Sequence, residues 1–148
     1  VYSVIPTRKW FFTHLFSFYL LKCRTEEEKV FLLNLILNWF NGSNDIKGQY
    51  IEGILSFKGQ KSLKEIPAYA TSVLQALNLR ELDLSHTQIA GLMNIKKLDV
   101  EHLNIAGTKV VDLKLNGING LKKVTISKNV KYSPKAFNKK GVEAVFEN

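Results

Sequence analysis

Apolar residues recur with a period of 21 residues in the second half of the chain. The first unit places apolar residues or threonine at relative positions 1, 4, 6, 9, 11, 14, 17 and 20, namely Leu79, Leu82, Leu84, Thr87, Ile89, Leu92, Ile95 and Leu98. The next two units repeat the first six and the first four of these positions, as Val100, Leu103, Ile105, Thr108, Val110 and Leu113, and as Leu121, Val124, Ile126 and Asn129. A fixed period of this kind predicts stacked units that bury their apolar edges against their neighbours. It also makes recognition rather than catalysis the default function.

Length and composition are those of one globular domain. The 148 residues are 45% hydrophobic and 23% charged, which excludes disordered and collagen-like chains. The lone Cys23 excludes an intramolecular disulfide and a cysteine-rich zinc site. The apolar run 10–21 is shorter than the about 20 residues needed to span a bilayer, and Lys22 argues against a lipoprotein signal. We therefore expect a packed helix and a cytoplasmic location, and we interpret the start at Val1 as that of a segment of a longer protein.

The first 45 residues predict a helical hairpin, with helices over about 8–22 and 25–40. Thr25 and Glu28 have the spacing of a capping box, and Asn41-Gly42 is typical of a helix end. Both helices are apolar on more faces than a small repeat stack can cover. We expect the hairpin to cap the N-terminal end of the core, and a symmetric dimer contact through its aromatic residues is a second interpretation. The residues expected in that contact are Trp10, Phe11, Phe18 and Trp39.

The sequence divides into four parts: a helical cap at 1–45, an irregular capping repeat at 46–78, the regular repeats at 79–133, and a C-terminal cap at 134–148. In the second part, 54–58 alternates like a strand and 62–77 has helical spacing interrupted by Pro67. In the last part we expect a short helix at 135–140 and a closing strand at 142–146.

The pattern LxxLxLxxTxI, read from Leu79 to Ile89 and from Val100 to Val110, resembles the leucine-rich repeat family, and its short bacterial class in particular. The resemblance covers about residues 50 to 133 and implies an α/β fold, a right-handed solenoid with parallel strands on its concave face. It also implies a bacterial protein in which such repeats are one part of a longer chain. Thr87 and Thr108 stand where the family usually has Asn, and we expect their hydroxyls to bond to nearby backbone instead. Ile118 is expected to replace the leucines missing from the second unit.

The resemblance implies a partner-binding concave face. The pairs Leu82/Leu84, Leu103/Ile105 and Val124/Ile126 are expected to point into the core, and strand alternation then turns the intervening residues outward. Members of the family usually bind partners on this face. The residues expected there are Glu81, Asp83, Ser85, His102, Asn104, Lys123, Thr125 and Ser127, with Ala106 between the two serines.

A cluster of basic residues supplies an alternative function. Residues 121–140 contain seven lysines and no acid, within a chain of net charge +8. Such a patch can bind nucleic acid or an anionic membrane, but it lacks Arg and has only two aromatic residues. We therefore favour a solvated face that protects the last strand from pairing with a second molecule. The lysines of the patch, apart from Lys123, are Lys122, Lys128, Lys131, Lys135, Lys139 and Lys140.

The sequence predicts no catalytic, metal or cofactor site. Glu81, Asp83, His86 and His102 are expected to lie close together, but they lack a recognised metal-ligand spacing. Ser85 and His86 are neighbours on a strand and would point to opposite faces. The chain also has no glycine-rich phosphate loop. We therefore expect a non-catalytic module for protein–protein interaction or assembly.

Overall fold

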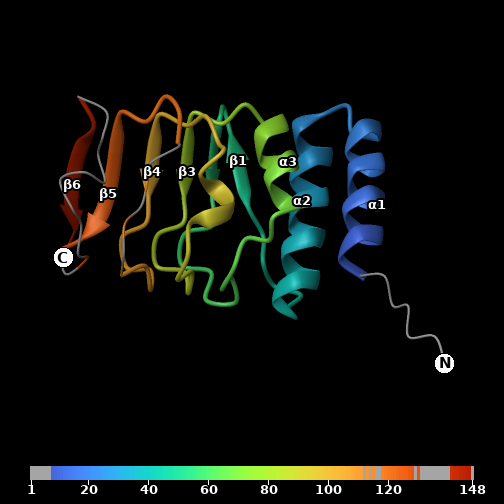
Figure 1. Cartoon of the computed structure of the whole chain (residues 1–148), viewed down its shortest axis with the longest axis horizontal. Helices are drawn as coiled ribbons and strands as arrows, with labels where there is room; N and C mark the ends of the chain where they lie inside the picture. Colours follow the sequence, from blue (N-terminus) through green and yellow to red (C-terminus); the bar gives the residue numbers. More distant parts are fainter. Residues whose placement is uncertain are drawn as a thin grey trace.

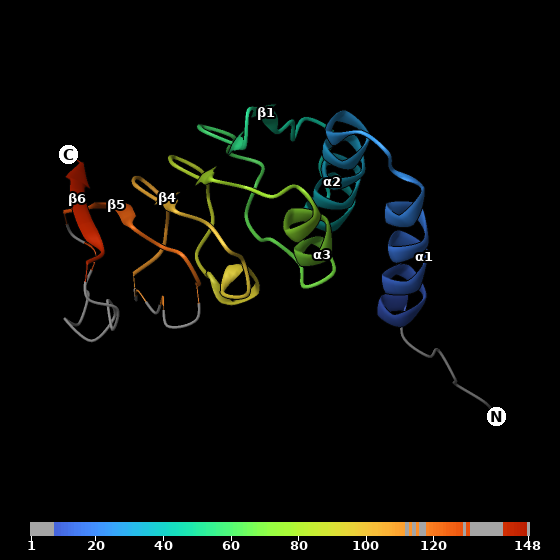
Figure 2. The ribbon, with the colours of Figure 1, turned by 90° about the horizontal axis from the view of Figure 1, so that it is seen from above.

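The computed structural model describes residues 8–111, 113, 115, 118–128, 130 and 141–147, with side chains from residue 15 onward. These residues form an α/β structure with three α-helices and an open six-stranded sheet whose strands follow one another in chain order (Figure 1). The elements are α1 (Arg8–Lys22), α2 (Glu26–Asn41), β1 (Gln49–Ile51), β2 (Ile54–Ser56), α3 (Ala70–Ala76), β3 (Glu81–Asp83), the 3-10 turn η1 (Met93–Ile95), β4 (His102–Asn104), β5 (Lys123–Ser127) and β6 (Glu143–Glu147). The sheet forms one side of the molecule, and α3 and η1 lie on the other (Figure 2).

Parallel pairing joins β2 through β6, as the repeat predicted, while β1 pairs antiparallel with β2. Register partners in the regular units are 21 residues apart: Glu81 faces His102, which faces Lys123. The same backbone bonds recur at each step. The amides of Glu101 and His102 both donate to the Arg80 carbonyl, and the amides of Lys122 and Lys123 both donate to the Glu101 carbonyl. The sequence period is thus also the period of the sheet.

The core lies beneath this sheet and contains the predicted inward pairs, each at most 1% exposed. The Thr87 hydroxyl donates to the Leu84 carbonyl at 2.8 Å, and the Thr108 hydroxyl donates to the Ile105 carbonyl at 2.8 Å. The expected bonding of both threonines as the chain leaves each strand is therefore confirmed. Ile118, at 2% exposure, fills the expected place in the second unit.

Helix α2 covers the N-terminal end of the core. It begins with the predicted capping box between Thr25 and Glu28 and ends at Gly42, whose φ of 62° is left-handed. Its apolar face is buried, with Leu33, Ile36 and Leu37 at most 1% exposed. Helix α1 packs against the outer side of α2, away from the sheet (Figures 1 and 2). None of the helices in the described part of the chain has the length and apolar character required to cross a bilayer.

Three asparagines on α2 hold the segment that leads into β1 and the segment between β2 and α3. The Asn38 side chain donates to the Ile46 carbonyl at 2.8 Å and accepts from the Ile46 amide at 2.9 Å. Asn34 accepts from the Gly48 amide at 2.8 Å, and Asn41 accepts from the amides of residues 64 and 65, both at 3.0 Å. These bonds satisfy backbone groups that have no sheet or helix partner.

The irregular capping repeat differs from its prediction in two ways. A hairpin joins β1 to β2 through Glu52 and Gly53, whose φ angles of 48° and 84° are those of a type I′ turn. The sequence did not predict β1, because Glu-Gly is not one of the strongly favoured hairpin turns. The helical spacing of 62–77 yields only α3, since Pro67 has no backbone N–H to donate and the helix begins after it. At the other end β6 confirms the closing strand, while the helix expected at 135–140 lies outside the described residues.

Candidate partner-binding surfaces

The outward face of the sheet carries a charged row formed by Glu81, His102 and Lys123. These residues are register partners on β3, β4 and β5, and all three are half-buried. The His102 Nδ1 lies 3.6 Å from the Glu81 Oε2. On β6, Glu143 occupies the next register position after Lys123. The row therefore runs across four strands from a carboxylate through an imidazole and an ammonium group to a second carboxylate.

A second outward row lies two residues further along the strands and contains Ser56, Asp83 and Asn104, whose side chains bond to backbone amides at the strand ends. The Asp83 Oδ1 accepts from the Ser85 amide at 2.9 Å, and the Asn104 Oδ1 accepts from the Ala106 amide at 3.1 Å. On β2 the Ser56 hydroxyl accepts from the amide two residues ahead at 3.2 Å, and it donates to the Asp83 Oδ2 at 3.4 Å. These side chains turn the chain out of each strand, so their acceptor atoms already have partners inside the protein.

The third predicted row is only partly exposed. Ser85 is 1% exposed, so the expectation that it contacts a partner is wrong. Strand β3 ends at Asp83 and β4 ends at Asn104. Ser85 and its counterpart Ala106 lie in the turns that follow these strands, and both are buried. Strand β5 continues to Ser127, which remains half-buried and accepts from the Gly107 amide at 2.6 Å. The alternation of inward and outward side chains therefore ends where the strand ends, and it does not predict the orientation of Ser85.

A small hollow of about 80 Å³ lies at the centre of this sheet face. Its lining combines the charged row with part of the second row: Glu81, His102, Leu103, Asn104, Lys123 and Thr125. The volume is far below that of a pocket for a drug-sized ligand, which is about 300 Å³ or more. The hollow has room for one small polar group.

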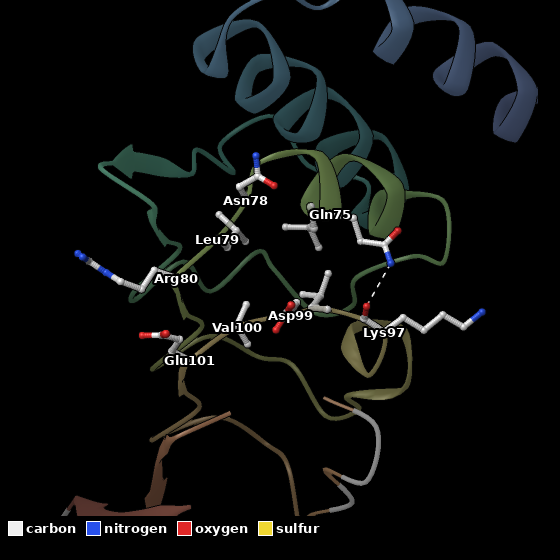
Figure 3. A pocket seen from close by; sticks show the side chains of 10 residues that line it. Gln75, Asn78, Leu79, Arg80, Lys97, Asp99, Val100 and Glu101 are labelled. Atoms are coloured by element: carbon white, nitrogen blue, oxygen red, sulfur yellow. Dashed lines mark hydrogen bonds between the residues drawn. The ribbon is translucent and has the colours of Figure 1, made fainter. Parts of the chain in front are cut away.

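A larger groove of about 580 Å³ opens beside the strand entries, between α3 and residues 97–101 (Figure 3). Its lining combines exposed polar side chains with Leu74, Leu79, Leu98 and Val100, each of which is at most 6% exposed. The residues of its rim are Gln75, Asn78, Arg80, Lys97, Asp99 and Glu101.

The two segments that carry helical turns beside this groove differ in length. Helix α3 has seven residues, whereas η1 has three. Asp99 forms a parallel bridge with Asn119 in the following unit, and the described part of the chain has no matching bridge between α3 and η1. The side chain of Gln75 reaches across instead and donates to the Lys97 carbonyl at 3.1 Å.

Only part of the basic patch lies among the described residues. The Lys122 Nζ lies 2.6 Å from the Glu101 Oε1, and this ion pair lowers the pKa of the Glu101 carboxyl below its ordinary value. The charge of Lys122 is therefore compensated by a neighbouring carboxylate. Lys128 lies just beyond β5, while Lys131, Lys135, Lys139 and Lys140 are outside the described residues.

The helical hairpin has an apolar outer surface. Phe18 is 55% exposed and Trp39 is 50% exposed, while the side chains of Trp10 and Phe11 lie outside the described part. An open hollow of about 770 Å³ runs between α1 and α2, and it is lined by Phe16, Tyr19, Lys22, Cys23, Glu27, Glu28, Phe31, Leu32 and Leu35.

Part of the aromatic surface packs internally. The rings of Phe16, Trp39 and Phe40 lie 5.7, 6.3 and 6.0 Å from that of Tyr69, between centroids. Burial of this ring raises the pKa of the Tyr69 hydroxyl to about 12. The cluster joins α1 and α2 to the loop before α3, which is a contact that the sequence did not predict.

Metal-ligating side chains do not cluster in the described part of the chain. No group of three or more His, Cys, Asp or Glu side chains is placed there to hold a metal ion. His86 has a left-handed φ of 57°, and its carbonyl accepts from the Lys61 Nζ at 2.7 Å. Gly59 and Gly107 occupy the same place in neighbouring units, with φ angles of 75° and 66°. The conformation of His86 is thus a feature of the repeat turn.

Comparisons of the chain with protein-family models, with curated proteins and with solved structures find no match.

Proposed function

We propose that this chain is a non-catalytic recognition module of the leucine-rich-repeat type, which binds a partner protein through the outward face of its sheet. The observation that carries the proposal is the charged row Glu81, His102 and Lys123, held at adjacent register positions about 4.8 Å apart on parallel strands. On the neighbouring row, the Oδ1 atoms of Asp83 and Asn104 are bonded at the strand ends, so the ionisable groups of the charged row are the main groups that this face offers to a partner.

Three structural features support the repeat type. Register partners in the regular units recur every 21 residues, the inward pairs are buried in each unit, and the two threonines make the same bond at each turn. We propose that the α-helical hairpin is the cap of this stack, because α2 covers the end of the core that precedes β1.

Selection from a random peptide library on the immobilised protein tests this function. We expect the selected binders to lose about tenfold or more in affinity for the triple variant Glu81→Ala/His102→Ala/Lys123→Ala, because it removes the whole charged row. The matched control replaces three exposed residues elsewhere, as Asn44→Ala/Lys64→Ala/Ser72→Ala. Binders that retain full affinity for the first variant would place recognition on another surface.

Self-association through the helical hairpin is a second candidate, favoured by the apolar hollow between α1 and α2. Phe31 is 65% exposed and Leu35 is 49% exposed in this hollow, which is unusual for a monomer surface. Lys22 stands on one rim and Glu27 and Glu28 on the other, so a two-fold axis would bring opposite charges together.

Sedimentation equilibrium over a range of protein concentrations measures this association directly. We expect a dimer that Phe31→Glu dissociates and that the exposed control variant Ser72→Ala leaves intact. A sedimentation mass that stays monomeric at high micromolar concentration excludes the dimer.

A further inference from the structure

The hollow on the outward sheet face is rich in hydrogen-bond donors and poor in acceptors. Lys123 contributes an ammonium group, Thr125 a hydroxyl and Asn104 an amide, and all three line the hollow. The Asn104 Oδ1 accepts from the Ala106 amide at 3.1 Å, which leaves the Nδ2 side of the same amide as its open end. Within the described part of the chain, the side chains of Lys123 and Thr125 have no hydrogen-bond or ion-pair partner.

The carboxylate in the hollow faces the imidazole of the charged row. Glu81 is its only carboxylate, and the Oε2 of Glu81 lies 3.6 Å from the His102 Nδ1. Asp83, on the next row, accepts from the Ser85 amide and from the Ser56 hydroxyl. A ligand group that enters the hollow therefore meets the unpartnered donors of Lys123 and Thr125 beside a Glu81 carboxylate that faces His102.

We propose that this hollow is a binding site for one carboxylate group of the partner protein, held by Lys123, Asn104 and Thr125. The inference rests on the proposed function, since it specifies the chemistry of the partner that the sheet face takes. A carboxylate matches three donors through its two oxygens and about four lone-pair positions. The volume of about 80 Å³ admits such a group but not a larger ligand.

The flanking charges predict how the affinity responds to substitution. Glu143 is exposed and occupies the register position next to Lys123, so its carboxylate competes with the ligand for the field of the ammonium group. Removal of Lys123 should weaken binding, and removal of the Glu143 charge should strengthen it. A patch that attracts anions in a non-specific way would not require Asn104 or Thr125.

The test is a titration of the isotope-labelled whole chain, followed by amide NMR spectra. The first probe is acetylglutamic acid N-methylamide, a side-chain carboxylate, and the second is acetylalanine, which carries a chain-terminal carboxylate. The neutral control is acetylglutamine N-methylamide, which has the same shape as the first probe. We expect saturable shifts of the Asn104 side-chain amide and of the Thr125 backbone amide with at least one carboxylate and not with the neutral probe. The carboxylate that binds identifies the source.

Substitutions complete the test. Lys123→Gln should weaken binding about tenfold or more, as expected for loss of a charge-assisted hydrogen bond. Glu143→Gln should strengthen it about twofold, and the exposed control Lys64→Gln should leave it unchanged. Spectra that are unchanged away from the sheet face show that each variant is folded.

Equal shifts with the neutral probe, or unchanged affinity in Lys123→Gln, would overturn the assignment to a carboxylate. The proposed function is tested separately by the library selection. If selected peptides need the charged row but carry no carboxylate at this position, the inference fails and the recognition face stands.

Discussion

We expect the substitution Asn38→Ala to destabilise the junction between α2 and the sheet, so that the protein unfolds at a lower denaturant concentration. The side chain donates to the Ile46 carbonyl at 2.8 Å and accepts from the Ile46 amide at 2.9 Å, and Ile46 is 0% exposed. Each bond contributes about 0.5–1.5 kcal/mol, and each buried group left without a partner costs about 1–3 kcal/mol. Alanine restores up to about 0.7 kcal/mol through its higher helix propensity. We therefore expect a loss of about 2–4 kcal/mol in the free energy of unfolding.

Urea denaturation followed by circular dichroism measures this loss, and a thermal scan should show a Tm lower by roughly 5–15 °C. The matched control is Asn44→Ala, because Asn44 is exposed and has no hydrogen-bonded side chain in the described part. Its effect should stay within about 0.5 kcal/mol. If Asn38→Ala costs no more than this control, the asparagine bonds do not hold the cap on the repeat stack.

Three further substitutions test the repeat turns and the aromatic cluster. Ser85→Ala should raise the free energy of unfolding by about 1 kcal/mol in urea denaturation, because the Ser85 hydroxyl is buried and has no hydrogen-bond partner in the described part, and because Ala106 fills the same place in the next unit; a loss of stability would refute this. Gly107→Ala should lower the Tm, with a cost of about 1–2 kcal/mol, because φ is 66° and the added Cβ would meet the His86 ring; an unchanged Tm would contradict it. Burial raises the pKa of Tyr69 to about 12 from 10.0, so its stabilising contribution is complete below pH 10 and is lost as the pH rises towards about 12. Tyr69→Phe should reduce this loss and remove the phenol that ionises last in an ultraviolet titration; an identical titration curve would argue against a buried phenol.

Local signals in the sequence were enough to predict the two N-terminal helices and the regular strands. The capping box at Thr25 and Glu28 is formed as expected, and the 21-residue period fixes the register of Glu81, His102 and Lys123. The capping box involves residues three apart, and the 21-residue period recurs in successive units. Both patterns can therefore be recognised in the sequence without knowledge of distant contacts. The coarse α/β architecture with a mostly parallel sheet follows from them.

Features that depend on distant contacts or on element lengths were not predicted. Asn38 looks like an ordinary polar helix residue, and only the folded chain brings Ile46 to it. Ser85 follows the alternation of the strand in sequence, but the strand ends two residues earlier at Asp83. The groove beside Gln75 lies next to α3, which is longer than η1, and periodicity does not reveal this difference in length. The alternation also placed Asn104 outward without showing that its oxygen holds the next turn.

The central claim is that the charged row binds the partner, whereas Asp83 on the neighbouring row stabilises the end of its strand. Single substitutions measured for both binding and stability test this claim most directly. A peptide from the library selection serves as the probe. His102→Ala and Lys123→Ala should each weaken its binding about tenfold while the Tm stays within about 2 °C. Asp83→Ala should lower the Tm, because it removes the bonds to the Ser85 amide and the Ser56 hydroxyl, and should leave the affinity of the folded protein unchanged. Loss of binding in Asp83→Ala alone, with full binding in the other two variants, would contradict the account.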